Sequence, residues 1–167
     1  MKPKNCLIFG GSGQIGRHLI RKLTANDIRV TVVTRNIHQK SFKIKTQGNA
    51  GYIEIVEANI FNETKIRELF EKADICINLV GILFEKKKGN SFDNIHCRFP
   101  LILAKLCKEY NLKQFIHLSA LGINDAIDSK YAKSKLEGEK NIINNFPLAI
   151  ILRPSVVYSV DDNFTTN

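Results

Sequence analysis

Residues 6–16 read CLIFGGSGQIG, a short apolar run followed by four glycines within seven positions. A continuous apolar run of this length is typical of a strand that is buried on both faces. From Gln14 onward apolar residues recur at helical spacing, so we expect a helix from Gln14 to about Ala25. Glycine inside a regular element costs roughly 1 kcal/mol relative to alanine. So many glycines between a strand and a helix therefore indicate a backbone that turns tightly and approaches another group closely.

The rest of the chain alternates strand-like and helix-like segments. We expect strands at residues 6–9, 30–34, 52–58, 75–80, 115–119 and 148–153. We expect helices at residues 14–25, 63–72, 92–110 and 131–144, and the connection 35–51 is the least regular. This alternation predicts an α/β protein with a doubly wound parallel β-sheet (a Rossmann fold) and helices on both faces. Since no linker or internal repeat is visible, we expect residues 1–167 to form a single domain.

The glycine loop can be written as Gly11-x-Gly13-x-x-Gly16 or with Gly10 as its first glycine. Between a strand and a helix this spacing is typical of a dinucleotide-binding turn. One glycine allows the tight turn, the next lets N–H groups reach a pyrophosphate, and the last allows close helix–strand contact. We therefore predict cofactor contacts from the loop residues Gly10, Gly11, Ser12, Gly13, Gln14 and Ile15. The alternative is a glycine-rich turn that serves only helix–sheet packing.

The end of the second expected strand bears on which dinucleotide is bound. A carboxylate about 20 residues after the loop would accept a hydrogen bond from the ribose 2′-OH of NAD. This chain has Val33-Thr34-Arg35-Asn36 there, and Asp27 lies before the strand. Because a guanidinium pairs well with a phosphate, Arg35 favours NADP(H) over NAD(H). The alternative is an ordinary surface arginine.

Tyr131 and Lys135 lie four residues apart in the segment SKYAKSKLEGE. On a helix this spacing places both side chains on one face. A nearby ammonium stabilises a tyrosinate, so the phenol could act as an acid or base, and the lysine could hold a cofactor ribose. The alternative is an ordinary surface pair.

The composition narrows the classes of partner. The net charge of +9 suits an anionic ligand such as a nucleotide, but the lysines are scattered, so we expect no nucleic-acid site. No apolar run approaches the ~20 residues of a membrane-spanning helix, and we expect no integral membrane segment. The four cysteines show no CxxC spacing and the four histidines are not closely paired, which predicts buried free thiols and no metal site.

Several blocks together resemble the extended, atypical branch of the short-chain dehydrogenase/reductase superfamily. They are FGGSGQIGRHL, NLVGILFE, FDNIH, HLSALG, YAKSKLEGE and ILRPSVVY, and the resemblance covers residues 5–164. That branch includes the nucleotide-binding accessory subunit of respiratory complex I and bacterial epimerase/dehydratase-like proteins. The resemblance implies catalytic positions at Ser119, Tyr131 and Lys135. Besides the glycine loop and Arg35, it implies cofactor contacts from Asn59, Ile60, Leu79, Val80, Gly81, Lys135 and Pro154.

The resemblance leaves three functions open. The first is an NADP(H)-binding protein of the complex I accessory type, with a structural NADPH and with complex I subunits as partners. The second is an active NAD(P)-dependent oxidoreductase or epimerase that uses Tyr131 and Lys135, and the third is a truncated remnant without activity. By analogy, the protein is expected in the cytoplasm, peripherally at the inner face of the inner membrane.

The chain departs from the family pattern at four places. Extended enzymes carry a catalytic Ser or Thr shortly after the first serine of the block that reads Ser119-Ala120-Leu121-Gly122 here. His96 stands where many members have Asn, and Tyr158-Ser159-Val160 replaces Tyr-Gly-Pro. Family members also continue with a large C-terminal substrate portion, which we expect to be missing or truncated because the sequence ends at Asn167.

Overall fold

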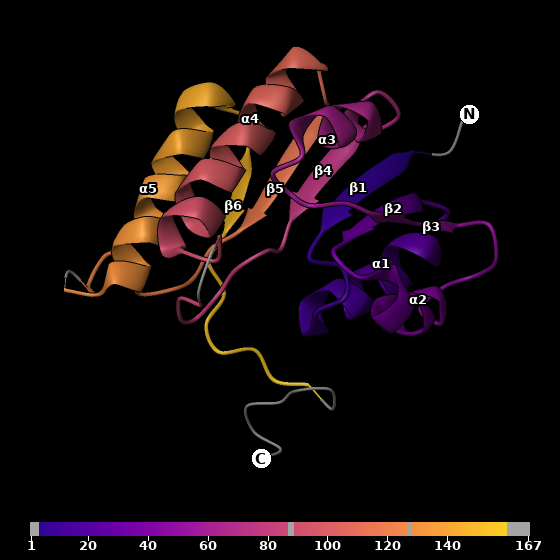
Figure 1. Ribbon diagram of the computed structural model, residues 1–167, viewed down its shortest axis with the longest axis horizontal. Helices are drawn as coiled ribbons and strands as arrows, with labels where there is room; N and C mark the ends of the chain where they lie inside the picture. Colours follow the sequence, from indigo (N-terminus) through magenta and orange to yellow (C-terminus); the bar gives the residue numbers. More distant parts are fainter. Residues whose placement is uncertain (1–3, 87–88, 127, 160–167) are drawn as a thin grey trace.

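Figure 1 shows the computed structural model, which describes residues 4–86, 89–126 and 128–159. Its strands are β1 (Asn5–Phe9), β2 (Arg29–Thr34), β3 (Ile53–Glu57), β4 (Ile75–Asn78), β5 (Gln114–Leu118) and β6 (Ile150–Leu152). They form one sheet in the order β3-β2-β1-β4-β5-β6, and every neighbouring pair is parallel. This is the strand order of a dinucleotide-binding α/β fold, and it confirms the predicted fold class.

Helices cover both faces of the sheet (Figure 1). Their bounds are α1 (Gln14–Thr24), α2 (Ile37–Lys45), α3 (Glu63–Phe70), α4 (Phe99–Glu109) and α5 (Lys130–Asn145). Alternate residues of β1 enter two separate buried clusters. Ile8 packs with apolar residues of α1 and α2, whereas Phe9 packs with those of α3, α4 and α5. Because both faces of β1 are covered, its sequence is a continuous apolar run rather than an alternating one.

Two segments differ from the prediction. The connection 35–51 contains α2, whose first turn is capped by Asn36: its side chain accepts a hydrogen bond from the Gln39 N–H at 3.1 Å. Ile44 is the only fully buried residue of α2, so the apolar pattern of this helix was weak.

The predicted helix 92–110 is divided into a π-helical segment η1 (Asp93–Arg98) and α4. Pro100 lies in the first turn of α4, directly after η1, at a helix position where proline is tolerated.

Beyond β6, residues 153–159 follow the surface without regular structure. The side-chain amide of Gln14 donates a hydrogen bond to the Val157 carbonyl at 3.3 Å, which joins this segment to the start of α1. Across the described ranges, no helix is long and apolar enough to cross a membrane. The same residues contain no cluster of three or more side chains suited to hold a metal ion, and the four cysteines are buried free thiols.

Candidate functional site

The turn after β1 has a shape that requires glycine. Gly10 adopts φ +81°, a region that L-residues with side chains rarely occupy, and a Cβ there would lie 2.9 Å from the Leu79 carbonyl carbon. The N–H of Gly13 donates to the Gly10 carbonyl at 3.1 Å, which closes the turn. The loops after β1 and β4 therefore touch where the strand order reverses, the crevice in which open α/β sheets bind ligands.

Two further glycines allow close packing around this turn. A Cβ on Gly11 would lie 2.6 Å from the Val32 side chain, and one on Gly16 would lie 2.5 Å from the Gly11 Cα. Gly13 is the N-cap of α1, and none of the described side chains caps this end of the helix. The first N–H groups of α1 are therefore available to an anion.

A cleft of about 610 Å³ opens beside the turn, within the ~300–1,000 Å³ range of ligand sites. It adjoins a hollow of about 740 Å³, and the two share Arg35, Ala58, Ile60 and Asn90 in their walls. The predicted cofactor residues that line the cleft are Gly10, Ser12, Gly13, Arg35, Ile60, Leu79, Val80 and Gly81. Asn59 lines the adjoining hollow, and Gly11 lies behind the turn against Val32.

Three more of the predicted cofactor residues, Gln14, Ile15 and Pro154, are absent from the walls of both the cleft and the adjoining hollow. The side chains of Gln14 and Ile15 face a different hollow, which they share with Val157. The carbonyl of Pro154 accepts a hydrogen bond from the Leu121 N–H at 2.9 Å. Gln14 and Ile15 belong to the first turn of α1, so only their backbone is placed to meet an anion at the glycine turn.

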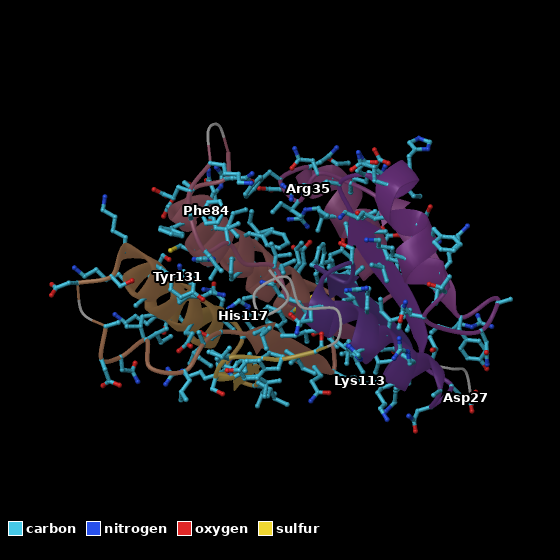
Figure 2. The ribbon with its side chains drawn as sticks, turned by 90° about the horizontal axis from the view of Figure 1, so that it is seen from below. Asp27, Arg35, Phe84, Lys113, His117 and Tyr131 are labelled. Atoms are coloured by element: carbon cyan, nitrogen blue, oxygen red, sulfur yellow. The ribbon has the colours of Figure 1, made fainter. Side chains whose placement is uncertain are left out.

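The end of β2 contributes positive charge to the cleft. Arg35 directly follows the strand and is exposed, and the cleft wall also includes Lys40 of α2. Asp27 precedes β2 and therefore lies at the amino-terminal end of the strands, away from Arg35. Its carboxylate accepts a hydrogen bond from the Tyr52 hydroxyl at 2.9 Å. Figure 2 shows Arg35 and Asp27 on opposite sides of the molecule. The sequence did not reveal Lys40, because its role depends on the unexpected helix α2.

Tyr131 and Lys135 share one face of α5, which begins at the N-cap Ser129. Lys135 is only 4% exposed; its ammonium donates to the Leu118 carbonyl at 3.2 Å and lies 6.0 Å from the centre of the Tyr131 ring. Burial lowers the pKa of Lys135 to about 8 and raises the pKa of Tyr131. A Cβ on Gly81 would lie 3.3 Å from the Lys135 Nζ, so this lysine reaches the wall of the cleft.

Ser119 is buried at the end of β5. Its N–H donates to the Leu152 carbonyl at 2.7 Å, while its Oγ has no hydrogen-bond partner among the described residues. Two residues further on, Leu121 is 65% exposed and carries no hydroxyl. The structure therefore places Lys135 and Ser119 at the same end of β5, without the second hydroxyl that extended enzymes use.

His96 joins the loop after β4 to α5. Its Nε2 accepts a hydrogen bond from the Ile82 N–H at 3.1 Å. The Ser134 hydroxyl donates to the Tyr131 carbonyl at 2.7 Å, and it therefore accepts from the His96 Nδ1–H at 2.9 Å. Burial lowers the pKa of His96 to about 3, and the charge of Lys135 contributes to the shift. The residue that departs from the family's asparagine is thus a neutral histidine that bridges two elements.

His117 on β5 is a second buried neutral histidine. The Asn78 amide donates to its Nδ1 at 3.1 Å, and the orientation of that amide follows because its Oδ1 accepts from the Val80 N–H. The Nε2–H of His117 has no partner among the described residues. Burial, followed by the charge of Lys135, lowers the pKa of His117 to about 3. This role could not be predicted from the sequence, since a histidine on a strand does not reveal what it contacts.

Comparison with known families decides the relationship of this chain. The model of the NAD dependent epimerase/dehydratase family matches residues 6–167. The chain belongs to this family. This assignment agrees with the resemblance to extended short-chain dehydrogenases that the sequence blocks indicated.

The relatives of this family member include respiratory-chain subunits. NADH dehydrogenase [ubiquinone] 1 alpha subcomplex subunit 9 of Mus musculus is 29% identical over 157 residues, which are 94% of this chain and 41% of the mouse protein. The NADH-ubiquinone oxidoreductase 40 kDa subunit of Neurospora crassa is 26% identical over 155 residues, 93% of this chain and 41% of that subunit. The chain therefore spans about two fifths of the length of these curated relatives.

Solved structures support the same fold. UDP-glucuronic acid 4-epimerase from Bacillus cereus, solved in complex with NAD, superimposes with a TM-score of 0.77 at 23% identity. The match covers 92% of this chain and 57% of the epimerase. At this identity the likeness shows that the two chains share a fold.

Proposed function

We propose that residues 1–167 form one NADP(H)-binding domain in which NADPH is a structural cofactor, as part of an accessory protein of respiratory complex I. The observation that carries this proposal is the glycine turn at the reversal of strand order. Its free helix N-terminus and the cleft beside it suit the pyrophosphate of a dinucleotide. Gly10, Ser12 and Gly13 would hold the pyrophosphate, and Leu79, Val80 and Gly81 would form the facing wall.

The preference for NADP(H) rests on charge at the end of β2. Arg35 and Lys40 both line the cleft, whereas Asp27 lies at the amino-terminal end of the strands. A guanidinium and an ammonium suit the 2′-phosphate of NADPH better than the 2′-hydroxyl of NADH.

A structural role is supported by the chemistry around Tyr131. Burial raises the pKa of this phenol, so it is protonated and a poor base near neutral pH. Leu121 stands where extended enzymes carry a catalytic hydroxyl, and the chain is similar to subunits of complex I. Binding without turnover accounts for these features together.

Calorimetric titration with NADPH and NADH tests the proposal. We expect NADPH to bind more tightly, and Arg35→Ala to remove most of that preference. Arg29→Ala is the matched control, because Arg29 begins the same strand, at its amino-terminal end. An unchanged affinity ratio in Arg35→Ala would contradict the role of Arg35, and absence of binding by both cofactors would contradict the proposal itself.

An active oxidoreductase or epimerase is the second candidate. It is favoured by Lys135, whose pKa of about 8 makes a proton available near physiological pH, and by its contact with the Tyr131 ring. Turnover of oxidised cofactor with a nucleotide sugar or a quinone, abolished by Tyr131→Phe, would support catalysis over a structural role. Absence of cooperative melting even with excess NADPH would instead support a remnant without activity.

The proposed partner is respiratory complex I, at the inner face of the inner membrane. The similarity to complex I subunits supports this placement. Co-migration of a tagged chain with complex I on native gels tests it, and migration of the chain apart from every complex I subunit would contradict it.

A further inference from the structure

The neighbouring strand β3 places a carboxylate beside the end of β2. Glu57 ends β3, and its register partner is Thr34, the last residue of β2. The Glu57 carboxylate accepts a hydrogen bond from the N–H of Ile37 at 2.9 Å. The Glu57 carboxylate therefore lies against the connection between β2 and α2. Arg35 belongs to this same connection.

Glu57 and Arg35 face one hollow. Both residues are exposed and both line the space of about 740 Å³ that adjoins the cleft, together with Lys65 of α3. A ligand group in this hollow meets a guanidinium and a carboxylate at once. A negatively charged ligand group would be attracted by Arg35 and repelled by Glu57.

The geometry points to Glu57 as a specificity-determining residue that opposes Arg35 by repelling the 2′-phosphate of NADPH. The inference rests on the proposed function, since it concerns the cofactor bound in the same cleft. A 2′-phosphate carries about two negative charges and is repelled by a nearby carboxylate, whereas the 2′-hydroxyl of NADH is not. Arg35 makes NADPH bind more tightly than NADH, and Glu57 reduces the ratio of the two affinities.

The fold explains why a carboxylate is kept at this position. Two side chains cap the start of α2: Asn36 accepts the N–H of Gln39, and Glu57 accepts the N–H of Ile37. An acidic group at a helix N-terminus is stabilising. Because these N–H groups are already bonded, they are not available to a 2′-phosphate. Its hydrogen bonds would have to come from the side chains of Arg35 and Lys40.

The test is calorimetric titration of Glu57→Gln with NADPH and with NADH. Glutamine keeps a side-chain oxygen for the Ile37 N–H and removes the charge. We expect NADPH to bind about three- to tenfold more tightly than to the unchanged chain, and NADH affinity to change by less than about twofold. Glu54→Gln is the matched control: Glu54 lies on the same strand, accepts a hydrogen bond from the Thr31 hydroxyl at 3.3 Å, and lines a hollow at the amino-terminal end of the strands.

The outcomes separate the inference from the proposed function. NADPH affinity that is unchanged or weaker in Glu57→Gln overturns the inference, and so does an equal gain in Glu54→Gln. If the unchanged chain binds neither cofactor, the proposed function fails and the inference fails with it. Thermal melting verifies that each variant is folded, and Glu57→Ala provides the same removal of charge if the glutamine variant does not fold.

Discussion

The glycine turn and the polar cluster beside α5 build the two ends of the candidate site by different means. The turn is defined by positions where no side chain fits, such as Gly10 against the Leu79 backbone. The cluster consists of His96, His117 and Lys135, each at most 4% exposed. The turn therefore depends on backbone shape, and the cluster on burial, which lowers the pKa of both histidines and keeps them neutral. Changes at the turn should act on binding, whereas changes at the cluster should act on stability.

The largest expected effect is on the packing of α5 against η1. A Cβ on Gly138 would lie 1.9 Å from the His96 carbonyl oxygen, a backbone atom that cannot move aside on its own. We expect Gly138→Ala to lower the free energy of unfolding by roughly 4–5 kcal/mol, as measured by urea denaturation. Lys133→Ala on the exposed side of the same helix is the control and should change it little. Equal stabilities of the two variants would show that α5 does not approach His96 so closely.

Acid should destabilise the protein through the same cluster. The folded-state pKa values of His96 and His117 are about 3, below the ordinary 6.5. The unfolded chain therefore binds more protons, and stability that is fully present above pH 6.5 is lost as the pH falls toward 3. Between pH 7 and pH 5 we expect a loss of about 2 kcal/mol per histidine.

Urea denaturation at these two pH values measures this loss. His117→Gln removes one titrating group, so the difference between pH 7 and pH 5 should shrink by about 2 kcal/mol. Substitution of the exposed His38 is the control and should leave the difference unchanged. A loss in His117→Gln as large as in the unchanged chain would contradict a neutral buried His117.

A methyl group at the glycine turn should separate binding from stability. Gly13 has φ −75° and ψ 176°, a conformation open to alanine, and its nearest contact to an added Cβ is the Gly10 carbonyl oxygen at 3.3 Å. Because Gly13 lines the cleft, we expect Gly13→Ala to weaken NADPH binding at least about tenfold while the free energy of unfolding changes by about 1 kcal/mol or less. Calorimetry and urea denaturation measure the two quantities. Full affinity in this variant would exclude close approach of the cofactor at Gly13.

The smallest predicted effect concerns α2, which lies beside the turn. Asn36→Ala removes the side-chain cap at the Gln39 N–H and should cost about 1 kcal/mol. Asn62→Ala is a matched comparison, because Asn62 caps α3 through the Lys65 N–H in the same way. Thermal melting measures both, and an unchanged melting temperature in Asn36→Ala would show that Glu57 alone caps α2.

The sequence predicted the fold and the glycine turn because both follow from local patterns. Continuous apolar strands, amphipathic helices and the spacing of Gly10, Gly13 and Gly16 are visible along the chain. The short helix α2 was not predicted because most of its residues are exposed, so its apolar pattern is weak. Because α2 was not predicted, the position of Lys40 in the cleft wall and the contact of the Glu57 carboxylate with the start of this helix could not be predicted either.

The cluster beside α5 could be predicted only in part. Tyr131 and Lys135 follow from their spacing, but the residues next to the Lys135 ammonium come from β5 and from the loop after β4, which are separate segments of the sequence. The protonation state of His96 and His117 depends on burial and on the nearby charge of Lys135. Such details are set by tertiary packing and leave no pattern in the sequence.

Backbone amide NMR of the chain during titration with NADPH tests the central claim most directly. If the glycine turn holds the pyrophosphate, the amide signals of Ser12, Gly13 and Gln14 should shift most, and those of Ile150 and Leu152 on β6 should stay in place. Shifts confined to other parts of the chain, or no shift of the Gly13 amide at saturating NADPH, would contradict the claim that this turn binds the cofactor.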